Sequence, residues 1–350
     1  MVKKILIVQN RIAEYRVEIF NLLNQNYDVT VLYSAGEKPE NAKFNVIHID
    51  NKKGKVFWKF KCNLGKLFSQ FDVVILPMDI RQIDAVAEVF RRKAKIISWG
   101  IGVSASYKIP FDSKRSIIME YVYIRNSTAC LFYSEYAAAK YSKVLGERAF
   151  VANNTASVRR IDINKEKKHL LFIGSLYPQK RIDELLEAYK TAYSECSVIP
   201  QLVIVGDGTE YKRIQQFIYD NNLHEKIILR GEVYDEEVLS EIFSSSIACI
   251  SPNQAGLSVL KSMGYGVPFV THKDAITGGE RLNIINGENG ILFNTFSELK
   301  QIIIDSGCKK DKFLEYGKNA YRYYWENRTP QIMVNGFEVA IEYATNESER

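Results

Sequence analysis

Apolar runs of strand length that alternate with helix-like segments limit most strongly what this chain can fold into. In the first half the runs are Ile5–Val8, Val29–Leu32, Val73–Leu76, Ile96–Ser98 and Ala129–Phe132, and the helix-like segments are Arg16–Asn24, Ile83–Arg91 and Ser113–Arg125. Strands that are buried on both faces of a parallel sheet give such uninterrupted apolar runs. The alternation therefore predicts an α/β fold built on a doubly wound parallel sheet.

The same alternation restarts after a polar segment, Asn153–Ser157, whose residues favour turns. Further strands are expected at His169–Ile173, Leu202–Val205, Ile227–Leu229, Ile247–Ile250, Pro268–Val270 and Ile291–Phe293, with helices between them. This pattern predicts a second Rossmann-like unit, with a boundary near residue 155, and a helical tail beyond it.

Composition narrows the class of protein. Residues 1–155 hold 24 basic and 14 acidic residues, a net charge of +10 against +6 for the whole chain, so this half is expected to meet an anionic partner. Five scattered cysteines suggest neither a disulfide framework nor a zinc site. The sequence has no apolar stretch of transmembrane length, and its start lacks the features of a signal peptide. We therefore expect a cytoplasmic protein.

Three glycine-containing turns follow predicted strands of the second unit. Gly174 opens a run that leads into a helix and carries Lys180 and Arg181. Gly206 and Gly231 end the next two strands. Strand-to-helix turns present backbone N–H groups to anions, and open α/β sheets bind ligands at the carboxyl ends of their strands. Each turn alone is equally well explained as a tight turn or a basic helix start, but their agreement favours a diphosphate site.

The segment from Ser251 to Pro268 is the most informative. A small polar loop follows a predicted strand and precedes a short helix whose N-terminus is unblocked. Gly256 allows a ligand to approach the backbone, and the N–H groups from Gly256 to Ser258 are expected to meet phosphate. Lys261 lies about one turn further along the same helix.

These segments resemble the retaining family 4 glycosyltransferases of the GT-B fold. The matching text is LLFIGSLYPQKRIDELLEAY, LVIVGDG, IILRGEV, AGLSVLKSMGYGVPFV and GGE followed by NGENGILF, in the family's order over residues 168–295; residues 1–155 match more weakly. The resemblance implies two facing Rossmann-like domains: residues 1–155 on the acceptor side and residues 156–310 binding the nucleotide sugar. It also implies that the C-terminal helices of residues 311–350 cross back to pack on the first domain.

The resemblance assigns the donor side to the second domain. Lys180 matches the lysine that holds the donor diphosphate, and Glu232 and Val233 match the loop that contacts the nucleobase. The other candidates for donor binding are Gly174, Ser175, Arg181, Gly206, Gln254, Ala255, Gly256, Leu257 and Ser258.

The chain departs from the family pattern in the donor site. Asn253 and Lys261 stand where the family has paired glutamates, and Ser175 stands where it usually has an arginine. Because a lysine donates hydrogen bonds but cannot accept them, we expect Lys261 to return to the diphosphate the charge that Ser175 lacks. Asn253 or Gln254 is then expected to hold sugar hydroxyls.

The candidate catalytic residues are Lys180, Lys261, Asn253 and Glu280. The remaining carboxylate, Glu280, serves either the sugar or the start of a helix. No Asp-x-Asp motif occurs, so the transfer is expected to need no metal and no cofactor, with cations and helix N-termini stabilising the leaving diphosphate.

On the acceptor side, the loop after the first strand leads into Tyr15, Arg16 and Phe20, a run that family members often share. It is either a substrate-facing loop or an ordinary capped helix start. Ile101 follows Trp99 and Gly100 where many members have a histidine. The acceptor-side candidates are therefore Arg11, Glu14, Tyr15, Arg16, Trp99, Gly100 and Ile101.

Residues 52–61 mix lysines with Phe57, Trp58 and Phe60. This composition suits an anionic membrane surface, although the aromatic residues could also simply pack inward. Nothing around the segment resembles a nucleic-acid-binding motif. We expect peripheral attachment at the inner face of the cell membrane and no nucleic-acid partner.

We therefore expect a retaining hexosyltransferase of bacterial surface polysaccharide synthesis (capsule or O-antigen). Its donor would be a UDP- or GDP-linked sugar, and its acceptor a glycan or polyprenyl-linked glycan. The alternatives are a non-catalytic GT-B subunit, which the missing glutamates favour, and a nucleotide-sugar epimerase. The first loop lacks the glycines of a dinucleotide-binding dehydrogenase.

Overall fold

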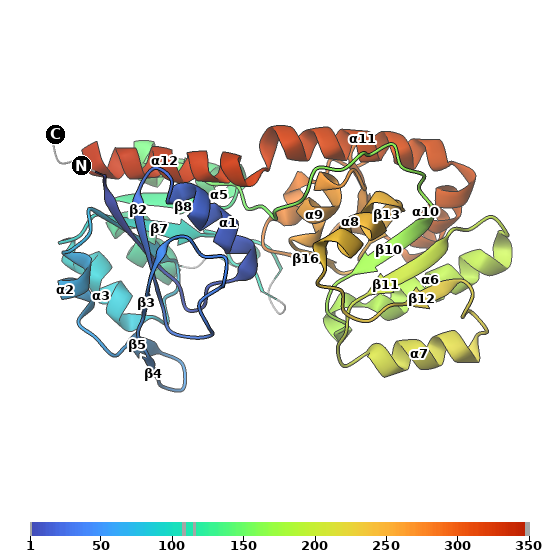
Figure 1. Ribbon diagram of the computed structural model, residues 1–350, viewed down its shortest axis with the longest axis horizontal. Helices are drawn as coiled ribbons and strands as arrows, with labels where there is room; N and C mark the ends of the chain where they lie inside the picture. The colour runs from blue at the N-terminus through green and yellow to red at the C-terminus, as the bar shows by residue number, and fades with distance from the viewer. Residues whose placement is uncertain (1, 107–109, 115–116, 347–350) are drawn as a thin grey trace. The chain divides into compact units, whose positions relative to one another are not determined.

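The computed structural model describes residues 2–106, 110–114 and 117–346, and the chain divides into two compact units (Figure 1). Unit 1 comprises Met1–Ser104, Asp112–Ser157 and Thr329–Arg350. Unit 2 comprises Ala105–Phe111 and Val158–Arg328. Among the described residues, no helix is long and apolar enough to cross a membrane.

Unit 1 is built on a seven-stranded parallel sheet in the order β3-β2-β1-β6-β7-β8-β9. Its strands are β1 (Lys4–Val8), β2 (Asp28–Tyr33), β3 (Asn45–His48), β6 (Val73–Pro77), β7 (Ile96–Gly100), β8 (Ala129–Phe132) and β9 (Ala149–Val151). Its helices are α1 (Glu14–Leu23), α2 (Leu64–Phe68), α3 (Ile83–Arg91), α4 (Ile117–Met119), the π-helix η1 (Glu120–Ile124), α5 (Glu135–Leu145), the 3₁₀ turn η2 (Gly146–Arg148) and α12 (Pro330–Asn346). The five strands predicted for this half are confirmed. Part of the helix predicted at Ser113–Arg125 lies outside the described residues.

Alternate residues of the central strands enter two different cores, because successive side chains of a strand point to opposite faces. Ile5 and Ile7 of β1 lie in the core that contains α1 and α12. Leu6 and Val8 lie in the core that contains α2 and α3. The sheet is therefore covered by helices on both faces, as its continuous apolar runs predict.

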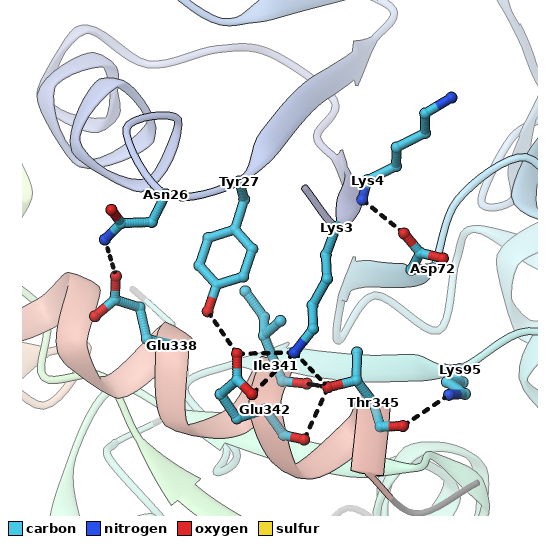
Figure 2. A network of polar contacts seen from close by, with 10 residues as sticks. All are labelled: Lys3, Lys4, Asn26, Tyr27, Asp72, Lys95, Glu338, Ile341, Glu342 and Thr345. Atoms are coloured by element: carbon cyan, nitrogen blue, oxygen red, sulfur yellow. Dashed lines mark hydrogen bonds and ion pairs between the residues drawn. The ribbon is translucent and has the colours of Figure 1, made fainter. Parts of the chain in front are cut away.

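Helix α12 belongs to unit 1 although it is the last element of the chain. Its buried side chains share the core of α1, and a Cβ on Gly336 would lie only 2.2 Å from the carbonyl oxygen of Val151, so the helix backbone packs directly on β9. Polar contacts fasten its end to the sheet (Figure 2): Lys3 Nζ lies 2.8 Å from Glu342, and Lys95 Nζ donates to the carbonyl oxygen of Thr345 at 3.1 Å.

Unit 2 has a six-stranded parallel sheet in the order β12-β11-β10-β13-β15-β17. These strands are β10 (His169–Ile173), β11 (Gln201–Val205), β12 (Ile227–Leu229), β13 (Ser246–Ile250), β15 (Phe269–His272) and β17 (Gly290–Phe293). The helices are α6 (Ile182–Glu195), α7 (Tyr211–Asp220), α8 (Glu236–Ser244), α9 (Ser258–Gly264), α10 (Phe296–Cys308) and α11 (Lys310–Asn327), with 3₁₀ turns η3 (Pro178–Lys180) and η4 (Glu280–Asn283). The short strands β14 (Gln254–Ala255) and β16 (Ile276–Thr277) pair beside the sheet.

The prediction that all of residues 311–350 pack on the first domain is wrong for α11, which belongs to unit 2. Ala320 and Tyr324 of α11 lie in the unit 2 core with α8 and α9. Gly317 permits this packing, since a Cβ there would lie 2.4 Å from the carbonyl oxygen of Gly266. The aromatic face of α11 therefore has its partner within unit 2, and only Thr329–Arg350 returns to unit 1.

The basic aromatic segment at residues 52–61 lies largely in a hairpin of β4 (Asn51–Lys53) and β5 (Trp58–Phe60). Phe60 is buried, and the half-buried Trp58 donates its Nε1–H to Asp79 at 3.4 Å. Phe57 and Val56 are exposed at the turn. Of the three aromatic residues expected at a membrane, Phe57 is the one that faces outward.

Candidate functional site

Glycine turns at the carboxyl ends of β10, β11 and β12 are bonded to one another through their backbones. Gly174 N–H donates to the carbonyl oxygen of Val205 at 3.0 Å, and Gly206 N–H donates to that of Gly231 at 2.8 Å. Gly206 has a φ of +146°, and a Cβ on it would lie 2.0 Å from the Gly174 carbonyl oxygen. Only glycine fits there. The fold thus gathers at one sheet edge the three turns that the sequence singles out.

Lys180 lies over the first of these turns. Its Nζ is 3.2 Å from the position that a Cβ on Gly174 would occupy. The side chain is half-buried, and in the described part of the chain no ion pair or hydrogen bond joins its ammonium to another residue. Burial lowers the pKa of Lys180, because desolvation disfavours the charged form. A cation without a counter-ion at this edge is the arrangement that an anionic ligand completes.

Arg181 does not share this position. Its guanidinium pairs with Glu184, one turn further along α6, and the side chain is exposed. Arg181 has a left-handed φ of 51°, which reverses the chain between η3 and α6. The second cation predicted for the diphosphate is therefore already engaged by a neighbouring carboxylate.

The loop after β13 is tied to the loop that carries Lys180. Asn253 Nδ2 donates to the carbonyl oxygen of Gln179 at 3.0 Å, which brings Asn253 next to Lys180. Nothing lies within 4 Å of the position that a Cβ on Gly256 would take. Helix α9 begins at Ser258 without a side-chain cap. Backbone N–H groups at an uncapped start of this kind can bind an anion.

Lys261 pairs with a carboxylate that sequence reasoning missed. Its Nζ lies 2.9 Å from Glu236 Oε1, and the Tyr265 hydroxyl donates to Glu236 Oε2 at 3.4 Å. Burial and the Glu236 charge raise the pKa of Tyr265 to about 12. The Lys261 side chain is 21% exposed and that of Glu236 is 54% exposed, so the carboxylate is the more open member of the pair. Only the place of Glu236, shortly after the Glu232 loop, could have drawn attention to it.

Comparisons with known proteins identify the second unit. Residues 153–320 match the family described as glycosyl transferases group 1. These residues, just under half of the chain, are similar to that family. An uncharacterized glycosyltransferase of Methanocaldococcus jannaschii is 25% identical over 225 residues, which are 58% of this chain and 61% of that relative. The chain spans less than two thirds of the length of the curated relatives it matches.

Solved structures identify the fold of the whole chain. HepE of Anabaena, crystallised in complex with UDP, has a TM-score of 0.70 at 15% identity, covering 97% of this chain and 100% of that one. The pneumococcal O-GlcNAc transferase GtfA, in complex with UDP and GlcNAc, has a TM-score of 0.68 at 12% identity, covering 98% and 99%. The fold is GT-B.

Within unit 2, Glu280 holds a turn. It is buried, and its Oε2 accepts hydrogen bonds from Gly278 N–H at 2.9 Å and from the Thr277 hydroxyl at 3.3 Å. It is also the first residue of η4. This geometry fits the alternative in which Glu280 serves the start of a helix. Its carboxylate stabilises the loop conformation, and we do not place it on the sugar.

The predicted nucleobase loop lies at the end of β12 in unit 2. Glu232 is exposed and accepts a hydrogen bond from the Tyr234 hydroxyl at 2.7 Å, while Val233 packs against a unit 2 core. Their backbone role stays a prediction. The exposed Ser175 and the half-buried Leu257 and Ser258 lie on the neighbouring loops of the same sheet edge.

Two acceptor-side predictions in unit 1 are wrong. Arg16 and Trp99 are 4% and 2% exposed. The Arg16 guanidinium lies 4.7 Å from the Trp99 ring centroid and 5.1 Å from that of Tyr133, and it donates to Asn154 Oδ1 at 2.9 Å. This buried cation–π cluster stabilises unit 1. Gly100 is buried beside it.

Arg11 and Glu14 line a cavity of about 800 Å³ in unit 1, together with Gly36, Lys38, Asn41 and their neighbours. These residues follow the carboxyl ends of β1 and β2, the edge at which open α/β sheets bind ligands. Tyr15 is exposed next to Glu14, and Ile101 is half-buried just beyond β7. Arg11, Glu14, Tyr15 and Ile101 therefore remain the accessible acceptor-side candidates, and the role of the buried Gly100 stays a prediction.

Proposed function

We propose that the protein is a glycosyltransferase of the hexosyltransferase type. Unit 2 binds a nucleotide sugar, and the anomeric configuration of the sugar is retained. The observation that carries the proposal is the half-buried ammonium of Lys180, which lies beside the Gly174 turn and has no counter-ion among the described residues. The match of residues 153–320 to glycosyl transferases group 1 supports the same conclusion.

For sugar transfer, unit 2 must stabilise the diphosphate that leaves the donor. When the bond between the anomeric carbon and the donor diphosphate breaks, its electron pair leaves with the phosphate oxygen, and negative charge develops there. Lys180 and the uncapped start of α9 provide positive charge and N–H donors for that oxygen. We propose that these groups act without a metal ion or cofactor.

The donor is proposed to be a UDP-sugar rather than a GDP-sugar. Two proteins with the same fold, HepE and pneumococcal GtfA, were crystallised with UDP. The acceptor is proposed to be a glycan or lipid-linked glycan that enters on unit 1 near Arg11 and Glu14. The +10 charge of residues 1–155 and the exposed Phe57 support a place at the inner, anionic face of the cell membrane, in surface polysaccharide synthesis.

We propose that Glu236 binds the ribose in place of the second family glutamate, which this chain lacks. A family glutamate at the position of Lys261 would accept hydrogen bonds from ribose hydroxyls. Here Lys261 instead holds the more exposed Glu236 carboxylate at 2.9 Å. A carboxylate accepts several hydrogen bonds, so Glu236 can accept from the ribose while Lys261 orients it. This replaces the prediction that Lys261 binds the diphosphate directly.

Ligand screening followed by product analysis tests the function. UDP-, GDP- and dTDP-sugars are compared by thermal shift, since a ligand that binds the native state raises its melting temperature. The sugar that stabilises the protein most is then incubated with and without glycan acceptors. Transfer that depends on an acceptor supports the proposal. Conversion of the donor without an acceptor identifies an epimerase or hydrolase, and stabilisation without any conversion identifies a non-catalytic binding subunit.

A further inference from the structure

Three arginines line a second cavity in unit 1, at the opposite edge of the sheet from the acceptor-side candidates. The cavity measures about 380 Å³ and is lined by Arg92, Arg125 and Arg148 with Asn126, Ser127, Thr128 and three apolar residues. Most of its lining residues directly precede β7, β8 or β9, so the cavity lies at the amino ends of these strands. Among the described residues that line it, none is acidic.

The arginines are positioned by polar contacts that leave donors free. Arg148 Nη1 donates to the carbonyl oxygen of Ser127 at 2.9 Å, and Arg92 Nη2 donates to Asn126 Oδ1 at 2.6 Å. Arg125 lies 3.6 Å from the Glu120 carboxylate. A guanidinium carries five N–H donors, so each of the three retains donors for an anion. Planar guanidinium groups match phosphate well.

An exposed apolar surface adjoins this cavity. Ile117, Ile118 and Tyr121 are 70%, 62% and 61% exposed, and the Tyr121 ring lies 5.9 Å from that of Phe90, which is 43% exposed. Asn126 of the cavity lining donates to the carbonyl oxygen of Tyr121 at 2.6 Å, which joins the surface to the cavity. We call Phe90, Ile117, Ile118 and Tyr121 the apolar rim.

The apolar surface continues along α3 toward the β4–β5 hairpin. Ile83, at the start of α3, is exposed. The hairpin lies beside it, because Trp58 N–H donates to the carbonyl oxygen of Arg81 at 2.9 Å. Val56 and Phe57 are exposed at the hairpin turn. Both ends of α3 therefore carry exposed apolar side chains on unit 1.

We propose that the apolar rim and the arginine cavity dock on a bilayer, with the phosphate of an anionic phospholipid in the cavity. A soluble phosphate would account for the arginines alone, and an apolar partner would account for the rim alone. An anionic phospholipid has both a phosphate and acyl chains, and arginines next to exposed apolar side chains match that combination. This inference rests on the proposed function and adds a lipid ligand to it. The lipid site is tested by vesicle binding and not by sugar transfer.

Vesicle binding tests the proposal on the full chain. Vesicles of phosphatidylcholine alone are compared with vesicles that also contain phosphatidylglycerol. Each arginine near an anionic surface contributes binding that corresponds to about fivefold in affinity. Arg125→Ser is therefore expected to weaken binding about fivefold, and Arg92→Ser/Arg125→Ser about 25-fold. Lys43→Ser, which also removes one exposed positive charge from unit 1, is the matched control and is expected to change binding little.

The rim is tested separately, and melting temperatures confirm that every variant folds. Ile118→Ser/Tyr121→Ser is expected to weaken vesicle binding while leaving UDP affinity unchanged. Equal binding to both kinds of vesicle, or no loss in either the arginine or the rim variants, overturns the proposal. So does glycerol phosphate binding in the cavity without any vesicle binding, which would identify a soluble anion. UDP affinity is measured on the same variants, so docking and nucleotide binding can fail independently.

Discussion

At the scale of single residues, the burial of the Lys167 charge lowers the free energy of unfolding. It is 5% exposed, its Nζ has no hydrogen-bond partner among the described residues, and burial lowers its pKa from 10.5 to about 8. At neutral pH the folded state must hold this charge, whereas the unfolded state solvates it. We predict that Lys167→Met raises the free energy of unfolding at pH 7 by about 2–4 kcal/mol.

The pH dependence checks the cause. Between about pH 8 and pH 10.5 the unfolded chain binds more protons at Lys167 than the folded chain does, so the stability of the parent rises with pH there. The difference between the parent and Lys167→Met in chemical denaturation should therefore be full below pH 8 and shrink above it. A difference that stays constant up to pH 10 would show that the variant acts through packing instead.

Variants of the Lys261–Glu236 pair distinguish a Glu236 carboxylate that binds the ribose from a Lys261 ammonium that binds the diphosphate. If Glu236 accepts from the ribose, Glu236→Gln and Lys261→Glu should each lower UDP affinity by roughly tenfold to a hundredfold, the range for hydrogen bonds to charged groups. Glu237→Gln is the control, since the Glu237 side chain is 80% exposed and pairs with Arg159. Calorimetry measures the UDP affinity of each variant. Tighter binding by Glu236→Gln would mean that the freed ammonium of Lys261 serves the diphosphate.

The position of a side chain could be predicted from the sequence where its neighbour is local. The place of Lys180 follows from a glycine turn six residues before it. The partner of Lys261 lies 25 residues away on another helix, and no spacing rule indicates it. Arg16 and Trp99 were misread because a polar or aromatic residue next to a loop can point into the core as easily as toward a ligand.

At the scale of elements, α6 and α10 pack against each other in unit 2 and bring two thiols together. Cys196 Sγ and Cys308 Sγ lie 3.7 Å apart, and both residues are at least partly exposed. We predict that glutathione disulfide oxidises this pair to an intramolecular disulfide. The two thiols lose two protons and two electrons, which break the S–S bond of glutathione disulfide and release two molecules of glutathione. Mass spectrometry of peptides should find the 196–308 cross-link, and Cys62, which is also exposed, should form none. Absence of the cross-link would contradict this helix packing.

Central strands were predictable because burial on both faces leaves a continuous apolar run. The edge strands β3 and β9 were not predicted. Their residues are half-buried or exposed, so neither shows that run, and pairing with a neighbour defines them instead. The helical tail was predicted, but the assignment of α11 was not, since a helix with aromatic residues on its buried face fits either unit until a partner is known.

At the scale of the whole molecule, the chain has separate cores in unit 1 and unit 2, and a matched pair of glycines tests this. A Cβ on Gly336 would lie 2.2 Å from the carbonyl oxygen of Val151, and one on Gly307 would lie 2.2 Å from that of Val198. We predict that each change to Ala costs about 1–3 kcal/mol through overpacking. Hydrogen exchange should rise in β1 and β2 for Gly336→Ala, and in β10 and β11 for Gly307→Ala. Equal effects on both units from either variant would contradict separate cores.

In the proposed function Lys180 makes unit 2 a nucleoside diphosphate site, and calorimetry with UDP measures how much its charge contributes. Lys180→Met keeps the length of the side chain and removes its charge, whereas Lys212→Met removes an exposed lysine from α7 of the same unit. A charge-assisted hydrogen bond contributes about 1.5–3 kcal/mol. Lys180→Met should therefore bind UDP roughly tenfold to more than a hundredfold more weakly than the parent, while Lys212→Met binds as the parent does. Parent-like UDP affinity in a folded Lys180→Met protein would contradict the claim.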